Sequence, residues 1–215
     1  MNQASNQSKA VIATYDDEAE ASGWYGPEVI FGLMYHFVKS GESIMDIGIG
    51  TGLASVLFRK AGLKVHGMDG SPQMLDACRH KGFEALKMHD LSHSPYPYDS
   101  ESMHHVVSTG VFNFFSDLSL VFEESARILR QGGLFAFTVG DRTENEPHAI
   151  KVGAVHTRSD QTVTMYLHST EQIETWIEES GFRLFRSLAF QIFMDRERKK
   201  SIQAKAYLAR KIKMQ

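Results

Sequence analysis

Cysteine and long apolar segments are almost missing from this 215-residue chain. Its single cysteine, Cys78, excludes an internal disulfide and any site built from several cysteines, and this scarcity is typical of a reducing compartment. No apolar run is long enough to cross a bilayer, and the first residues lack the basic start and apolar core of a signal peptide. We therefore expect a cytoplasmic protein without a membrane span.

An excess of positive charge is also missing. The formal net charge is −3, whereas nucleic-acid-binding proteins usually have a strongly basic balance, so we do not expect DNA as a partner. Basic residues gather between positions 196 and 213, where we interpret them as the solvated ends of a last hairpin; a partner for this tail stays open. No histidine, acid and cysteine grouping has the spacing of metal ligands, so we expect no metal.

The remaining composition is ordinary for a folded protein, with 42% hydrophobic and 23% charged residues and no internal repeat. The length suits one domain with a sizeable core, and the oligomeric state is not indicated. We predict a single domain over residues 1–215. Its parts are N-terminal cover helices (11–40), a cofactor-binding core (41–140), a substrate-side insertion (141–169) and a C-terminal helix with a strand hairpin (170–215).

Strand and helix patterns alternate through the first 140 residues. This alternation predicts an α/β fold with a parallel sheet and helices on both faces. The expected strands are 43–47, 64–69, 83–90, 104–110 and 134–140, and the expected helices are 27–41, 53–62, 71–82 and 117–133.

The C-terminal third departs from this alternation. Ser169 and Gln172 form a capping box for a helix over 171–181. Two strands, 183–193 and 201–211, follow with a short turn between them, so we expect them to be antiparallel. Residues 152–169 are left over as a hairpin-like insertion after the fifth strand.

The stretch IMDIGIGTGLAS, residues 44–55, places three glycines on alternate positions shortly after Asp46. Ligands of open α/β sheets bind beyond the carboxyl ends of the strands. The polar residues expected at this edge are Asp46, Asp69, Asp90 and Ser108. We therefore expect the ligand to meet the glycine turn there.

The residue types at this edge discriminate between ligands. A dinucleotide loop needs G-x-G-x-x-G/A, but Leu53 stands at the last position and Asp46 would repel a pyrophosphate. An NAD(P)-dependent reductase is therefore the less favoured alternative. S-adenosylmethionine fits better, since it carries an ammonium and a sulfonium and no phosphate. Asp69 is placed to accept from the ribose hydroxyls and Asp90 from the adenine amino group.

The sequence resembles the class I S-adenosylmethionine-dependent methyltransferases, and within them the small-molecule subgroup that includes ubiquinone/menaquinone methyltransferases. The resemblance covers roughly residues 10–210. It rests on DIGIGTGLAS, VHGMDGSPQML, the HDL at 89–91, VVSTGVFNFF and ARILRQGGLFAFTV. It implies a Rossmann-like, seven-stranded, mostly parallel sheet with an antiparallel C-terminal strand.

The resemblance also implies residue roles around S-adenosylmethionine. The glycine loop would wrap the methionine moiety, with Asp46 near its ammonium group. Gly70 and Met74 would pack on the adenine, and residues 108–110 would lie under the sulfur and methyl. The full set of expected cofactor-binding residues is Tyr15, Trp24, Asp46, Gly48, Gly50, Gly52, Leu53, Asp69, Gly70, Met74, His89, Asp90, Leu91, Ser108, Thr109 and Gly110.

The fourth strand ends in STGVF and lacks the Asn/Asp-Pro-Pro-aromatic motif associated with methylating base or amide nitrogens. This departure argues against DNA and glutamine side chains as substrates. We expect in-line transfer of a methyl group to a small, largely apolar or amphipathic acceptor, through an atom that stays open. The alternative from another class is a non-catalytic S-adenosylmethionine-binding regulatory protein.

A catalytic base is needed only if the acceptor arrives protonated, because orientation in a dry pocket supplies much of the acceleration. The catalytic group is therefore unknown, with His148, His156, Tyr166 and His168 as candidates. They belong to the insertion 141–169, which we expect to form the acceptor pocket over 108–112 together with residues 11–26. The alternative for the insertion is a plain extension of the sheet.

Overall fold

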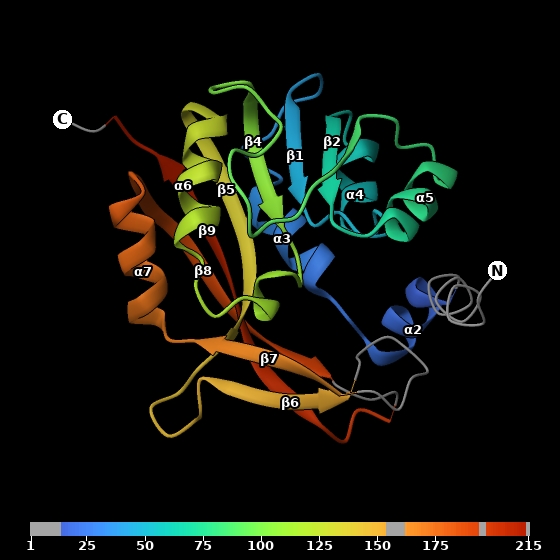
Figure 1. The fold of residues 1–215 in the computed structure, drawn as a ribbon, viewed down its shortest axis with the longest axis vertical. Coiled ribbons are helices and arrows are strands. Elements are labelled where there is room, and N and C mark those ends of the chain that lie inside the picture. The colour runs from blue at the N-terminus through green and yellow to red at the C-terminus, as the bar shows by residue number, and fades with distance from the viewer. Residues whose placement is uncertain (1–13, 154–161, 194–196, 214–215) are drawn as a thin grey trace.

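The computed structural model describes residues 14–153, 162–193 and 197–213. A central sheet carries helices on both faces, and two short helices precede its first strand (Figure 1). These are α2 (Tyr15–Ser22) and α3 (Gly26–Met34), with Gly23 in the left-handed conformation that ends α2.

The parallel part of the sheet has the order β3-β2-β1-β4-β5. The predicted alternation of strands and helices, and with it the α/β fold class, is confirmed. The strands are β1 (Ser43–Ile47), β2 (Lys64–Asp69), β3 (Leu86–Met88), β4 (Met103–Ser108) and β5 (Leu129–Asp141). The helices between them are α4 (Ser55–Lys60), α5 (Pro72–His80) and α6 (Ser119–Ile128), with a 3-10 turn η1 (Phe112–Phe114) after β4.

Two helix starts follow local sequence chemistry. Ser71 caps α5 by accepting a hydrogen bond from the Met74 amide at 3.3 Å, and Pro72 stands in the first turn. Ser169 caps α7 (Thr170–Glu179) by accepting from the Gln172 amide at 3.2 Å, which is one half of the predicted capping box.

The C-terminal strands form the antiparallel hairpin that the sequence predicts. β9 (Ser201–Lys211) pairs with β5 on one side and with β8 (Phe182–Phe193) on the other, antiparallel in both cases. β8 therefore forms this end of the sheet.

Over the described residues the sheet has nine strands, not the expected seven. The insertion forms a hairpin of β6 (Ala149–Gly153) and β7 (Thr162–His168), as expected, and β7 also joins the sheet through Gly140 and Asp141 at the end of β5. The length of β5 explains this extension, because its pairing with β4 ends at Phe137 and leaves the following residues projecting beyond β4. The hairpin thus lies below the carboxyl ends of the parallel strands (Figure 1).

Apolar side chains cover both faces of the central strands. On one face, Phe137 packs 4.8 Å from Phe135 and stacks on Tyr207 at 5.3 Å between ring centres, beneath α6 and α7. On the other face, Ile30 of α3 and Phe58 of α4 belong to a second cluster. Burial on both faces explains the apolar run LFAF, residues 134–137, in the middle of β5. None of the described helices is both long and apolar enough to span a membrane.

The junction of β5 and β7 gives a test of the fold. A Cβ atom added at Gly140 would lie 2.6 Å from Cδ2 of the buried Leu167. We predict that Gly140→Ala lowers the free energy of unfolding by about 1–3 kcal/mol through this overpacking. Leu167→Val removes the δ carbons, so the double variant should be at least about 1 kcal/mol more stable than the sum of the single effects in urea unfolding. Additive effects would show that β7 does not pack on Gly140.

Candidate functional site

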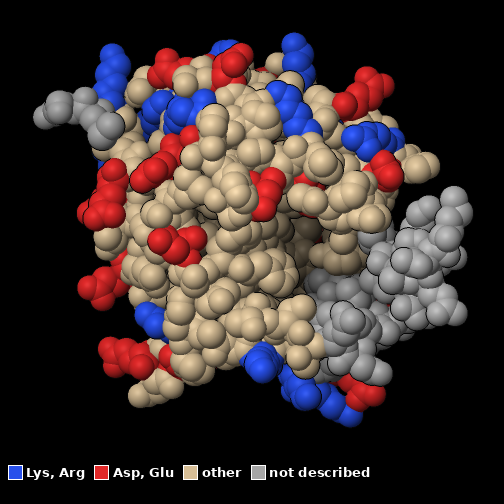
Figure 2. All heavy atoms as spheres, in the orientation of Figure 1, with Lys and Arg blue, Asp and Glu red and all other residues tan. Residues whose placement is uncertain are grey.

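A cavity of about 630 Å³ lies at the carboxyl ends of the parallel strands. Figure 2 shows the hollow in the surface beside the ends of β1 and β2. Its walls come from α2, the start of α3, the loops after β1, β2, β3 and β4, and parts of β7 and β8. The lining residues are Tyr15, Trp24, Pro27, Asp46, Gly48, Ile49, Gly50, Thr51, Leu53, Ala54, Asp69, Gly70, Ser71, Met74, Asp90, Leu91, Thr109, Gly110, Val111, Asn113, Phe114, Phe115, Val163, Met165 and Ile192.

The loop after β1 exposes its backbone to the cavity. Gly50 has φ +55°, a conformation that favours glycine, and the nearest neighbour of an added Cβ there would be 4.0 Å away. The Gly48 and Ile49 amides both donate to the Met68 carbonyl, at 2.8 and 3.0 Å, which holds the loop against β2. A ligand can therefore approach the main chain at Gly50 without meeting a side chain of that residue.

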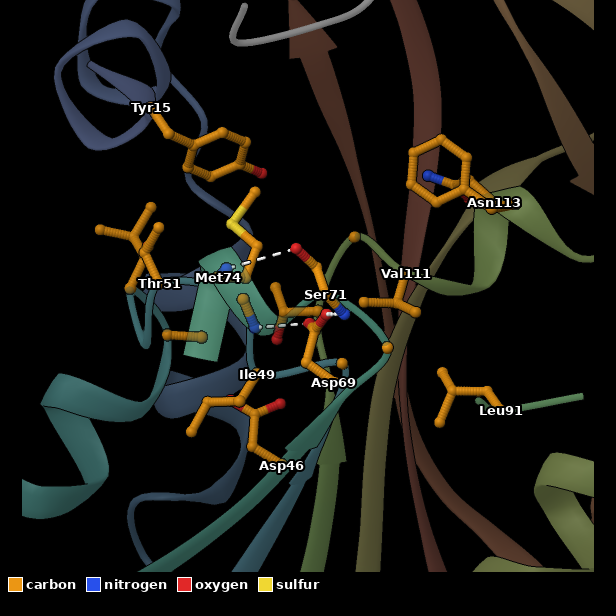
Figure 3. A pocket seen from close by; sticks show the side chains of 18 of the residues that line it. Tyr15, Asp46, Ile49, Thr51, Asp69, Ser71, Met74, Leu91, Val111 and Asn113 are labelled. Atoms are coloured by element: carbon orange, nitrogen blue, oxygen red, sulfur yellow. Dashed lines mark hydrogen bonds between the residues drawn. The ribbon is translucent and has the colours of Figure 1, made fainter. Parts of the chain in front are cut away.

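Asp69, at the end of β2, joins the two loops that border the cavity. Its Oδ2 accepts from the Gly50 amide at 2.9 Å and its Oδ1 from the Ser71 amide at 2.8 Å (Figure 3). Each carboxylate oxygen has a further lone pair, so the group can still accept hydrogen bonds from a ligand's hydroxyls.

Asp46, at the end of β1, is only 2% exposed. Burial raises the pKa of its carboxyl to about 7 and the nearby Asp69 adds to this rise, while the Ser55 hydroxyl, which donates to Oδ2 at 2.7 Å, opposes it. A cationic group bound beside Asp46 would favour the ionised carboxylate.

Asp90 lies at the rim of the cavity and is solvent-exposed. Its Oδ1 accepts from the amide and the hydroxyl of Ser92, at 2.9 and 2.8 Å. These two hydrogen bonds, the amide first, lower the pKa of Asp90, so this carboxylate is ionised at neutral pH.

The helix α2 covers one side of the cavity. The Thr51 hydroxyl donates to Asp16 Oδ1 at 2.6 Å, and Lys81 forms an ion pair with the same carboxylate, so α2 is fastened to the glycine loop and to the end of α5. This places Tyr15 in the cavity wall, where burial, with Asp16 and Asp69 adding to it, raises the pKa of its phenol to about 12. Tyr15 is therefore a neutral hydrogen-bonding group there.

The wall opposite the glycine loop is largely apolar. It includes Phe114, Phe115, Val163 and Met165. Asn113 also lies in it, at 4% exposure, and the sequence reasoning above did not select this residue. The signal was present, because an asparagine interrupts the otherwise apolar run VFNFF, residues 111–115.

Three of the expected cofactor-binding residues do not line the cavity. Ser108 is fully buried and its hydroxyl donates to the Ile47 carbonyl at 2.9 Å. His89 turns its ring towards the His93 carbonyl, 2.7 Å from Nε2. A Cβ atom added at Gly52 would meet Phe83 and Cys78, so this residue faces the apolar cluster beside α5. The other expected residues are lining residues: Tyr15, Trp24, Asp46, Gly48, Gly50, Leu53, Asp69, Gly70, Met74, Asp90, Leu91, Thr109 and Gly110.

The structure brings none of the described catalytic candidates to the cavity, although the insertion 141–169 contributes Val163 and Met165 to its wall. Alternate residues of a strand face opposite sides, and it is Val163 and Met165 of β7 that face the cavity, leaving Tyr166 and His168 on the other side. His148 stands on that side too, 5.4 Å from the Tyr166 ring, and His156 lies outside the described residues.

His168 is unsuited to proton transfer in the cavity for a second reason. Its ring has no solvent exposure and lies 5.6 Å from both His148 and Trp176. Burial lowers the pKa of this imidazole to about 4, with His148 as the next cause, so the ring is neutral. His148 donates from Nδ1 to the Leu167 carbonyl at 2.9 Å and borders a separate hollow near the start of α7.

The donor set of the cavity fits S-adenosylmethionine. Three carboxylates, of Asp46, Asp69 and Asp90, border the space around Gly50, while its described lining residues include no lysine or arginine. A cationic ligand with ribose hydroxyls suits this arrangement, and a pyrophosphate would be repelled. Within the described part of the chain, no group of three or more potential metal-binding side chains comes together.

Comparisons with known proteins find methyltransferases. A family model described as a methyltransferase domain matches residues 45–137. The chain is 32% identical over 99 residues to a malonyl-[acyl-carrier protein] O-methyltransferase of Serratia marcescens, covering 46% of this chain and 38% of that protein. It is 26% identical over 158 residues to a demethylmenaquinone methyltransferase of Tropheryma whipplei, covering 68% and 66%. The matches thus span less than two thirds of these relatives.

Solved structures share the fold. An S-adenosylmethionine-dependent methyltransferase of Methanosarcina mazei superposes with a TM-score of 0.72 at 13% identity, covering 85% of this chain and 98% of that one. A methyltransferase of Haloferax volcanii, solved in complex with the Trm112 methyltransferase activator, gives a TM-score of 0.67 at 21% identity, covering 95% and 99%.

The buried acid at position 46 predicts a pH dependence of stability. The folded-state pKa of Asp46, about 7, exceeds its ordinary value of 3.8, so between these pH values the folded protein keeps a proton that the unfolded chain has released. The free energy of unfolding therefore loses a contribution of about 1.4 kcal/mol per pH unit as the pH rises through this window. Asp46→Asn cannot ionise, so its stability relative to wild type should increase by on the order of 4 kcal/mol from pH 4 to pH 8.

Urea unfolding of the ligand-free protein at several pH values measures this difference. Asp76→Asn is the matched control, because Asp76 is an exposed acid on α5 whose surface ion pair with Arg79 contributes little to stability. A constant difference between wild type and Asp46→Asn across the pH range would contradict the raised pKa.

Proposed function

We propose that this protein is a class I S-adenosylmethionine-dependent methyltransferase and transfers a methyl group from S-adenosylmethionine to a small-molecule acceptor. The observation that carries the proposal is the acidic, glycine-lined cavity at the carboxyl ends of the strands. Its chemistry suits the cationic cofactor of the family.

The chain's own residues supply the binding contacts. Asp46 would face the positive end of the cofactor, Asp69 would accept from the ribose hydroxyls, and Asp90 would accept from the adenine amino group. When bound, S-adenosylmethionine supplies a methyl group already activated by its cationic sulfur. The glycine loop and Met74 would fit around the body of the ligand.

Orientation and exclusion of water are the catalytic work left to the protein. Tyr15 and Trp24 cover one side of the cavity, and Phe114 and Met165 form the apolar wall. No histidine, lysine or cysteine occurs among the described lining residues, and we assign the three lining carboxylates to the cofactor. We therefore propose an acceptor that is nucleophilic without a dedicated base.

The wall chemistry also supports a class of acceptor. The relatives are named for demethylmenaquinone, which is largely apolar, and for malonyl-acyl-carrier protein, which presents a carboxyl group. The described cavity wall offers apolar side chains and no cation, so we propose an uncharged acceptor with an apolar body. We also propose a cytoplasmic location, supported by the single cysteine, which is buried and unpaired.

Ligand-induced stabilisation tests the cofactor assignment. A ligand present at 100 times its Kd and bound only by the folded state raises the free energy of unfolding by about 2.7 kcal/mol. We predict that S-adenosylhomocysteine raises the melting temperature and NADH does not. Asp69→Ala should lose most of this rise because affinity falls about 30- to 1,000-fold, whereas Asp76→Ala, with its exposed side chain, should keep it. Stabilisation by NADH alone would refute the cofactor assignment.

Transfer of a labelled methyl group tests turnover itself. We predict that incubation with methyl-labelled S-adenosylmethionine and a metabolite extract labels a small, extractable compound in proportion to enzyme concentration. Asp69→Ala should reduce the rate at limiting cofactor through its weaker binding. A protein that binds S-adenosylhomocysteine but labels nothing would be a non-catalytic binder.

A further inference from the structure

Asn113 is a buried polar residue in the apolar wall of the cavity. It lies in η1 between Phe112 and Phe114, and Figure 3 shows it across the cavity from Tyr15 and Met74. The other described lining residues from 113–115, β7 and β8 are Phe114, Phe115, Val163, Met165 and Ile192. Asn113 is thus the one polar side chain among these described wall residues.

One hydrogen bond determines the orientation of the Asn113 amide. The Gly140 amide donates to Oδ1 at 2.6 Å. Because a backbone N–H group can only donate, the oxygen of the side-chain amide must face β5, and the nitrogen must face away from it. Among the described residues, the bond from the Gly140 amide is the one hydrogen bond of this side chain, and none accepts from Nδ2. Two N–H donors therefore stay available on a residue that lines the cavity.

A purely structural role explains the oxygen of the Asn113 side chain but not its nitrogen. Oδ1 satisfies the Gly140 amide at the point where β7 branches from β5, and a buried amide left without a partner would be costly. An aspartate could do the same with one of its oxygens. The nitrogen has no such task, and it is not among the fully buried side-chain atoms without a partner, so it is accessible to a ligand or to water.

We propose that Asn113 recognises the methyl acceptor by donating a hydrogen bond from Nδ2 to an oxygen of that molecule. The acceptor is then an uncharged apolar body that carries a carbonyl, enol or phenol oxygen and packs on Phe114 and Met165. A hydrogen bond to this oxygen would also stabilise the enolate or phenolate that forms when the enol or phenol releases its proton to water. The proposal rests on the proposed function and adds the recognition of the acceptor.

Matched probes test this recognition without knowledge of the natural acceptor. Tetralin, 1-tetralone and 2-aminotetralin share one bicyclic body and differ in carrying no polar group, an oxygen acceptor or an amine. Their affinities are measured by NMR titration of the protein saturated with S-adenosylhomocysteine. Wild type should bind 1-tetralone about 3- to 10-fold more tightly than tetralin, as expected for one neutral hydrogen bond.

Asn113→Asp retains an oxygen for the Gly140 amide and removes the donors. Its preference for 1-tetralone over tetralin should disappear, and 2-aminotetralin should become the best ligand of the three. Met165→Ala is the matched control, since it removes apolar contact and should weaken 1-tetralone and tetralin alike with their ratio unchanged. Melting temperatures report whether each variant is folded.

The wild-type comparison keeps the proposal testable even if Asn113→Asp does not fold. Equal affinity of wild type for 1-tetralone and tetralin, or no binding of 1-tetralone at its solubility limit, overturns the proposal, as does a tetralone preference that survives in Asn113→Asp. Failure of S-adenosylhomocysteine to bind is a separate result, because it refutes the proposed function while the probe affinities can still be compared without it.

Discussion

The Asp69 carboxylate determines the shape of the ligand-binding edge. By accepting from the Gly50 and Ser71 amides, it connects the loop after β1 to the start of α5 across the ends of two neighbouring strands. The parallel pairing of β1 with β2 makes this possible, because it brings the two strand ends together. The glycine turn, the covering helix α2 and the position of Met74 all depend on this local framework, and the Thr51–Asp16 hydrogen bond extends it to α2.

The opposite wall depends on a different constraint, the length of β5. Because β5 continues beyond its partner β4, its last residues pair with β7 and carry the hairpin over the strand ends. Asn113 binds to the same segment through Gly140. The cofactor side is therefore built from loops that directly follow strands, whereas the proposed acceptor side is built from segments distant in the sequence.

This difference explains which features could be predicted from the sequence. The strands, the serine caps and the acids at strand ends depend on local patterns, and a parallel sheet brings strand ends to one edge whatever the details of packing. The direction in which β7 turns its side chains depends on its register with β5, which no local pattern specifies. That register directs Val163 and Met165, and not Tyr166 and His168, to the cavity. The role of Asn113 could not be predicted from the local sequence, because its orientation depends on a hydrogen bond from the Gly140 amide, 27 residues away.

The protonated state of Asp46 has a consequence for charge balance. In the ligand-free protein near neutral pH, the Asp46 carboxyl is present in both its neutral and its anionic form. A cation arriving beside it would displace the proton, so a positive charge enters as another leaves and the buried site stays electrically balanced. Below pH 7 the cation would compete with protons, and its affinity would fall about tenfold for each pH unit. The cation and a proton would thus exchange at the same carboxylate, and ligand binding would depend on the pH of the surroundings.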